Sequence, residues 1–98
     1  MKTDWIDIQN DPRHIAKERQ KAKGLKKSQW WKNKLAQGIC HYCTKFFSKE
    51  ELTMDHIVPL SRGGMSVKSN IVVSCKECNN KKKYLTPVEI LLRSLAVK

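Results

Sequence analysis

The sequence predicts a small α+β domain in which two short strands and several helices are held together by a metal ion. Four cysteines form two CxxC pairs, at 40–43 and 75–78. Two apolar segments with strand-like content, 52–58 and 70–75, lie between these pairs. The remaining segments carry helical patterns and caps. Because 98 residues give only a thin stability margin from their core, we expect the cysteines to act as a staple.

Residues 1–37 are expected to form a basic N-terminal helical arm. Residues 1–10 show no clear period, and Asp11-Pro12 then has the form of a helix start, with an N-cap and Pro at the first helical position. Residues 13–24 are rich in helix formers but contain one large aliphatic residue, and Gly24 ends the pattern. Burial cannot hold such a helix, so we expect either an exposed arm or a helix that a partner orders.

A second helix is expected from Ser28, a cap residue, to Gly38. Trp31 and Leu35 are four residues apart and would share one face, with Trp30 beside them. We favour core packing of the tryptophans over base stacking. The surrounding lysines would then line the solvent side, where a phosphate backbone can lie.

Residues 38–86 are expected to form the metal module. A strand over 52–58 leads into a polar loop over 59–69 that contains two adjacent glycines. The second strand, 70–75, leads into a helix over 76–85 that begins at the second cysteine pair. The order is therefore strand, loop, strand and helix, bracketed by cysteines.

A C-terminal packing helix is expected over 87–98. Thr86 and Glu89 form a capping box, with Pro87 at the first helical position. The apolar side of this helix consists of Ile90, Leu91, Leu92 and Leu95.

Cys40, Cys43, Cys75 and Cys78 supply four thiolates, a complete tetrahedral shell for Zn²⁺. Such a shell leaves no position for a substrate, so the zinc would be structural. The N-terminus has no secretory signal pattern, and reduced thiols in a cytoplasmic protein favour metal binding over disulfides. The competing interpretation is that the cysteines are packed as small apolar residues. His41 could replace a thiolate, but four cysteines already suffice, so we expect it at the surface or in contact with a phosphate.

The charge indicates a polyanionic partner. The chain has 20 basic and nine acidic residues, a formal charge of +11, and both halves are basic. Phosphate neutralisation and counterion release would drive binding to nucleic acid, which we favour over charge that serves solubility alone. A membrane partner is not expected, because no basic segment has a strongly apolar opposite face, and no apolar run is long enough to span a bilayer.

Asp55, His56, Asn70 and Asn79 form a second polar set. Hydrolysis of a phosphodiester needs a base for water and a cation on the phosphate. Carboxylate and carboxamide oxygens suit Mg²⁺ or Mn²⁺. An isolated Asp-His pair is more often a surface hydrogen bond, so the interpretation depends on the whole set.

The order and spacing of these residues resemble those of HNH endonucleases of the ββα-metal class, in the branch with four cysteines and zinc. The resemblance covers about residues 38–86. The matching positions are Cys40, Cys43, Asp55, His56, Pro59, Gly63, Gly64, Asn70, Cys75, Cys78, Asn79 and Lys82.

The resemblance implies a role for each residue of the polar set. His56 would be the general base that activates water, and Asp55 would bind the catalytic divalent ion. Asn70 would brace the loop and orient the histidine. Asn79 would complete the metal site, where many relatives carry histidine, which leaves the preferred ion open. The reaction implied leaves a 5′-phosphate and a 3′-hydroxyl.

One conflict concerns the strand that carries Asp55 and His56. Neighbours on an ideal strand point to opposite faces, so we expect an irregular strand end there, or a metal at the strand edge that the helix reaches. Contacts with double-stranded DNA are expected from basic residues near the site, although each is equally well explained as a solvated charge. These residues are Arg62, Lys68, Lys81, Lys82 and Lys83.

Three functions are compatible with the pattern. The first is a metal-dependent HNH endonuclease or nickase that acts on DNA. The second is a non-catalytic zinc-bearing module that only binds nucleic acid, and the third is an adaptor whose basic surface meets an acidic partner. The polar set favours the enzyme, because a pure binder does not need an open metal position beside a histidine.

Overall fold

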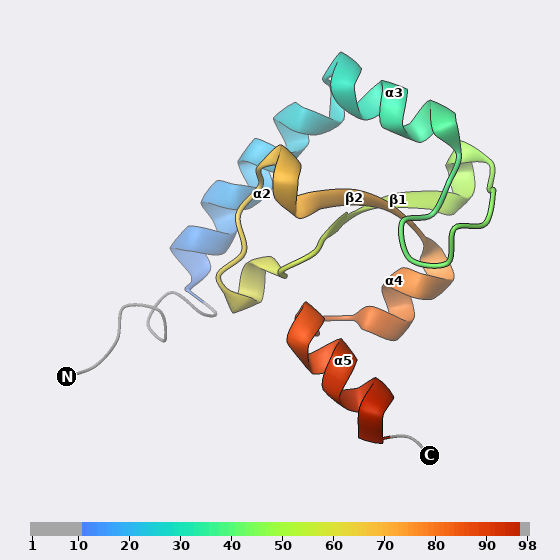
Figure 1. The fold of residues 1–98 in the computed structure, drawn as a ribbon. Helices are drawn as coiled ribbons and strands as arrows, with labels where there is room; N and C mark the ends of the chain where they lie inside the picture. The colour runs from blue at the N-terminus through green and yellow to red at the C-terminus, as the bar shows by residue number, and fades with distance from the viewer. Residues whose placement is uncertain (1–10, 97–98) are drawn as a thin grey trace.

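The structure is a computed structural model that describes residues 11–96; residues 1–10, without a clear sequence period, and 97–98 lie outside the described part. It confirms the predicted α+β class, since a two-stranded antiparallel sheet is combined with helices in the described part (Figure 1). The elements are α2 (Pro12–Lys26), α3 (Gln29–Gln37), β1 (Leu52–His56), β2 (Ile71–Cys75), α4 (Lys76–Lys82) and α5 (Pro87–Ala96).

Strands β1 and β2 pair in a regular register from Leu52 opposite Cys75 to His56 opposite Ile71. β1 therefore ends two residues earlier than predicted. The reason is Asn70, whose backbone carbonyl accepts from the N–H of Ile57 and whose side-chain Oδ1 accepts from the N–H of Val58. The Ile57 bond keeps the register of the ladder, but at Val58 the Asn70 side chain is the acceptor in place of backbone, so the regular ladder ends here.

The core lies between the hairpin and α3. Trp31 is 4% exposed and packs with Leu52, Ile71 and Val73, so core packing of this tryptophan is confirmed. α3 begins where predicted, because the Ser28 side chain accepts from the N–H of Trp31. It ends at Gly38 in the left-handed conformation, as a glycine C-cap allows.

The prediction that the first helix is an exposed arm, or is ordered only by a partner, was wrong. α2 continues through Gly24 to Lys26, and Glu18 is only 2% exposed. A carboxylate takes the place of the missing aliphatic residues, because Glu18 accepts a 2.6 Å bond from the N–H of Ser66. His14 Nε2 lies 2.8 Å from the carbonyl oxygen of Gly64. Polar contacts with the loop between the strands therefore fix α2 to the module.

The capping box of α5 is confirmed, because Glu89 accepts from the N–H of Thr86 and Thr86 Oγ1 accepts from the N–H of Glu89. The predicted packing of its apolar side was wrong for most of that side. Leu91, Leu92 and Leu95 are 58–63% exposed, and only Ile90 is half-buried. A salt bridge between Arg62 and Glu89 (2.7 Å) joins α5 to the loop. Within residues 11–96, no helix has the length and apolar character needed to cross a membrane.

Candidate active site and metal centre

The four cysteines meet at one end of the hairpin. Their Sγ atoms all lie within 4.8 Å of one another, and none forms a disulfide. Zn–S bonds of about 2.3 Å place tetrahedral sulfurs roughly 3.8 Å apart, so the cluster fits a zinc ion after a small contraction. Burial opposes ionisation of Cys40, but surrounding backbone N–H groups outweigh it and lower the pKa of this thiol to about 6. Cys40 is therefore prepared to supply a thiolate, whereas burial and then the neighbouring cysteines raise the pKa of Cys78 to about 12.

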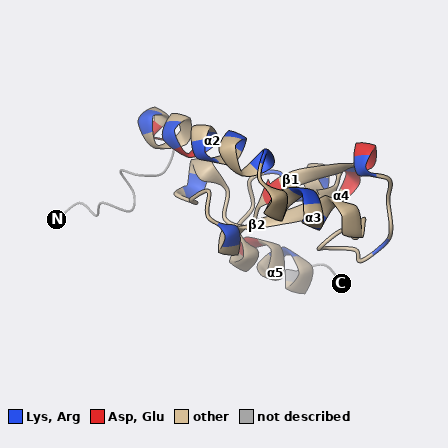
Figure 2. Cartoon of the chain, turned by 90° about the horizontal axis from the view of Figure 1, so that it is seen from above, with Lys and Arg blue, Asp and Glu red and all other residues tan. Residues whose placement is uncertain are grey.

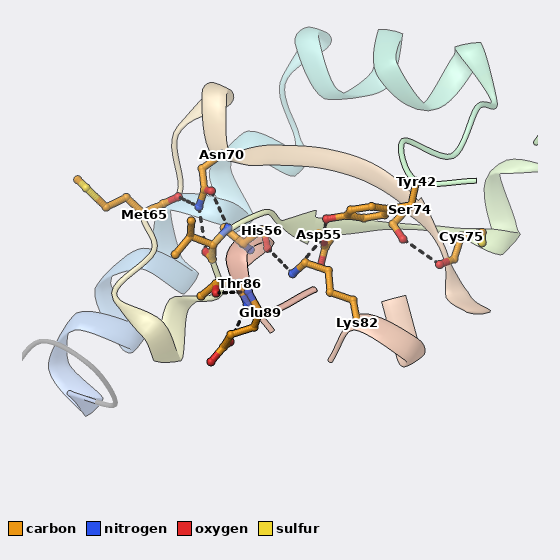
Figure 3. Close-up of polar contacts among 11 residues, drawn as sticks. Tyr42, Asp55, His56, Met65, Asn70, Ser74, Cys75, Lys82, Thr86 and Glu89 are labelled. Atoms are coloured by element: carbon orange, nitrogen blue, oxygen red, sulfur yellow. Dashed lines mark hydrogen bonds and ion pairs between the residues drawn. The ribbon is translucent and has the colours of Figure 1, made fainter. Parts of the chain in front are cut away.

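Asp55 lies at the end of β1 and is 6% exposed. Its Oδ2 accepts a hydrogen bond from the Tyr42 hydroxyl and lies 3.4 Å from the Lys82 ammonium (Figure 3). Burial raises the pKa of Tyr42, and the Asp55 carboxylate raises it further. Within the described residues no hydrogen bond or ion pair reaches Oδ1 of Asp55. One carboxylate oxygen is therefore used by the protein and the other is left for a ligand.

The His56 imidazole is oriented by two residues outside the strand. His56 Nε2 lies 2.9 Å from Ser66 Oγ. The Ser66 hydroxyl donates its only hydrogen to the backbone carbonyl of Glu18 (2.6 Å). Ser66 Oγ must therefore accept from His56, which places the imidazole proton on Nε2 and the lone pair on Nδ1. Burial lowers the pKa of His56, and this keeps the ring neutral near pH 7.

The loop between the strands is held by Asn70 and shaped by two glycines. Asn70 Nδ2 donates to the carbonyls of Val58 (3.1 Å) and Met65 (2.8 Å), as Figure 3 shows. Gly63 has a φ of 87°, which only glycine adopts readily. A Cβ on Gly64 would stand 1.8 Å from the carbonyl oxygen of Val58. Asn70 thus braces the loop, although the side chain that bonds to His56 is that of Ser66.

A cleft of about 210 Å³ opens beside this loop, and Asp55, His56 and Asn79 all line it. The conflict over neighbouring strand residues is resolved without a bulge. β1 ends at His56, and α4 packs against both strands and brings Asn79 to the cleft. Asn70 is not among the residues that line this cleft. Carboxylate and carboxamide oxygens in one cleft suit a hard divalent ion that keeps most of its water ligands.

The basic residues predicted to contact DNA have different environments. The prediction for Lys82 was wrong, because its side chain is 5% exposed and its ammonium donates to the carbonyl of His56 (2.9 Å). Arg62 is paired with Glu89, and Lys81 lies 3.5 Å from Glu77.

Lys68 and Lys83 are exposed. The Lys68 ammonium lies 5.6 Å from the centre of the Trp30 ring, and Lys83 lines the cleft. These two lysines are thus the members of the predicted set whose charges have no acidic partner among residues 11–96.

Sequence reasoning missed three residues that support the site. Tyr42 lies inside the first CxxC pair, and its place beside a proposed zinc ligand could have indicated a role. Glu18 is the one acidic residue of a basic helix, which is a weaker signal of the same kind. Ser66 carries no signal, because loop serines are common and its partners are 10 and 48 residues away.

A hairpin followed by a helix, with a four-cysteine cluster at one end and a histidine where the first strand stops, has the arrangement of a ββα-metal module. Residues 40–84 match the family model of the HNH endonuclease, and this part of the chain is an HNH endonuclease domain. No curated protein was found that matches the chain. The match assigns the module a nuclease or nucleic-acid-related function. It leaves α2, α3 and α5 outside the matched range.

Proposed function

We propose that the protein is a metal-dependent endonuclease or nickase that hydrolyses phosphodiester bonds of double-stranded DNA. The observation that carries the proposal is the state of His56. Its Nε2 is occupied by Ser66, so the neutral ring presents Nδ1 as the free acceptor, beside Asp55 and Asn79 in one cleft. A base of this kind is required to remove a proton from the attacking water.

Each residue of the cleft has a separate task in this proposal. His56 Nδ1 takes the proton of the water that attacks the phosphorus, and the bond between the phosphorus and the 3′-oxygen breaks. The departing oxygen takes a proton from solvent water, which gives a 5′-phosphate and a 3′-hydroxyl. Asp55, through Oδ1, and Asn79 would hold Mg²⁺ or Mn²⁺. The ion, when bound, stabilises charge on the phosphate and on the departing oxygen. Lys82 fixes the other oxygen of Asp55 and the backbone of His56.

The structural zinc has no chemical step in this proposal. Cys40, Cys43, Cys75 and Cys78 would hold it and fix β2 against α4. The three parts of the chain would be a helical arm over 1–37, the zinc module over 38–86 and a C-terminal helix over 87–98, within one domain.

One observation favours the alternative, a zinc-bearing module that binds nucleic acid without cutting it. The Lys82 ammonium already lies beside Asp55, so the carboxylate has less charge to offer a second cation. A single assay distinguishes the two functions, because a nuclease and a binding module both bind DNA but only the nuclease cleaves it.

The test uses supercoiled plasmid with the zinc-loaded protein and added Mg²⁺ or Mn²⁺. We expect wild type to convert the plasmid to relaxed circles and His56→Ala to lose at least ~100-fold in rate, as expected for loss of a general base. His41→Ala is the matched control, since His41 is an exposed histidine of the same module. DNA ligase should seal the nicks directly if the ends are a 5′-phosphate and a 3′-hydroxyl.

Two results would reject the enzyme. In the first, the plasmid stays intact with every divalent ion while the protein still retards it, which supports the binding module. In the second, His56→Ala cuts as fast as wild type, which removes His56 from the mechanism.

A further inference from the structure

A second groove, of about 350 Å³, adjoins the cleft. It shares Arg19, Met54, His56 and Leu60 with the cleft lining, so the two hollows meet at the histidine. The remaining lining of the second groove comes entirely from α2, through Ala22, Lys23 and Lys26. A ligand that lies in this groove therefore runs along the helix and reaches His56.

Arg19, Lys23 and Lys26 lie on one face of α2, because residues four and seven positions apart coincide on a helix of 3.6 residues per turn. All three side chains are exposed. The ion pairs among residues 11–96 use other cations, so no described carboxylate neutralises these three. The three positions span roughly 10 Å along the helix, which corresponds to about three phosphates of one strand.

The face of α2 beside these three residues contacts the loop between β1 and β2. Glu18 binds Ser66, and His14 binds Gly64. The same Ser66 orients His56. The basic face and the imidazole are thus positioned by one set of contacts. Lysine and arginine positions, blue in Figure 2, recur along the length of α2.

We propose that Arg19, Lys23 and Lys26 form a phosphate-binding track, called here the α2 track, that guides one nucleic-acid strand to His56. The partner class is a nucleic-acid backbone, because the track offers three exposed cations at helical spacing, and none of them has a described acidic partner. Two residues predicted to provide such contacts, Lys82 and Arg62, are occupied within the protein. This proposal rests on the proposed function, because the track leads to the proposed nuclease site. It concerns the binding of nucleic acid and not the cleavage step.

The test compares two triple variants with equal loss of charge. Arg19→Gln/Lys23→Gln/Lys26→Gln removes the α2 track, and Lys17→Gln/Lys45→Gln/Lys49→Gln removes three exposed lysines that line neither hollow. Glutamine preserves helix propensity, and circular dichroism and zinc content check the fold. Affinity for a labelled DNA duplex is measured by fluorescence anisotropy over a series of salt concentrations, without Mg²⁺ or Mn²⁺.

The track variant should bind at least ~10-fold more weakly at ~0.15 M salt, and its slope of log affinity against log salt should fall by about 2 to 3. The control variant should keep most of the slope. The single variant Lys23→Gln should lower the slope by about 1, which keeps the test valid if the triple variant folds poorly. Equal losses in both triple variants, or an unchanged slope in the track variant, would overturn the proposal. A plasmid that wild type leaves uncut rejects the nuclease and does not affect this readout.

Discussion

Lys82 and Lys83 show how the environment of one residue decides its role. They are neighbours in a run of three lysines, yet Lys82 is 5% exposed and Lys83 is exposed. Burial of an ammonium is costly unless it is paired and hydrogen-bonded. Asp55 and the carbonyl of His56 provide both kinds of partner. The Lys82 charge therefore holds the site together, while Lys83 remains available to a ligand.

Ser66→Ala should lower the cleavage rate of the proposed nuclease. Without the hydroxyl, His56 loses the acceptor that fixes its Nε2 proton, so the ring can present the wrong nitrogen or turn away from the water. We expect a loss of about 10- to 100-fold in kcat, part of what a positioned base contributes. Plasmid nicking under saturating Mg²⁺ measures this, with Ser69→Ala, an exposed serine of the same loop, as control. Equal rates for the two variants would show that Ser66 does not orient the base.

Glu89 should titrate far below an ordinary glutamate. The Arg62 guanidinium and then the N–H of Thr86 lower the pKa of Glu89 from 4.5 to about 2. Its contribution to the attachment of α5 is therefore complete above about pH 4.5 and is lost as the pH falls through about 2. The carboxyl carbon shift of Glu89 in an NMR titration reports this pKa, and Arg62→Ala should return it toward 4.5. A wild-type midpoint already near 4.5 would contradict the ion pair.

At the scale of elements, the loop between the strands is the part that unites the site. It supplies the hydroxyl that orients His56, shares three hydrogen bonds with α2, and is braced by Asn70 from its own end. Apolar burial does not fix the tip of this loop, because Met65 and Val67 are 49% and 41% exposed. Its conformation is instead determined by hydrogen bonds and by the close approach of Gly64 to Val58. A change in the loop backbone should therefore disturb both α2 and the histidine.

Gly64→Ala and Gly24→Ala should have opposite effects on stability. A Cβ at Gly64 would stand 1.8 Å from a backbone oxygen, whereas one at Gly24 meets nothing within 4 Å. We expect Gly64→Ala to lower the free energy of unfolding by roughly 2 kcal/mol or more, because backbone must move. Gly24→Ala should raise it by about 0.5 to 1 kcal/mol, the helix preference of alanine over glycine. Urea denaturation measures both, and a neutral Gly64→Ala would disprove the tight turn.

At the scale of the whole molecule, stability depends on a core that includes metal ligands. Cys40 and Cys75 are 0% and 2% exposed and belong to the same cluster as Trp31, Ile71 and Val73. Four unligated thiolates in contact would repel one another, and protonated thiols would not hold the two segments together. Metal binding and folding should therefore be coupled, as in other small zinc modules.

Removal of zinc by a strong chelator should unfold the module. We expect loss of the cooperative thermal transition and a red shift of tryptophan fluorescence, because Trp31 leaves the core. Readdition of one equivalent of Zn²⁺ should restore both signals, whereas Mg²⁺ should not, since thiolates favour the softer ion. A metal-free protein that keeps the transition unchanged would show that the cysteines are packed without a metal role.

The sequence alone determined the order of the elements, the four-cysteine cluster and the placement of Asp55 and His56 side by side at the end of the first strand. These features depend on local spacing, caps and residue chemistry, all of which can be read from the sequence. Only the tertiary structure decided that Lys82 is buried, that Ser66 and Glu18 orient His56, and that α2 forms one wall of the groove. Those contacts join residues 10 to 48 positions apart through polar groups, and polar contacts of this range leave no period in the sequence. Burial of a charge is decided by the partner that satisfies it, and the partner is known only when the chain is folded.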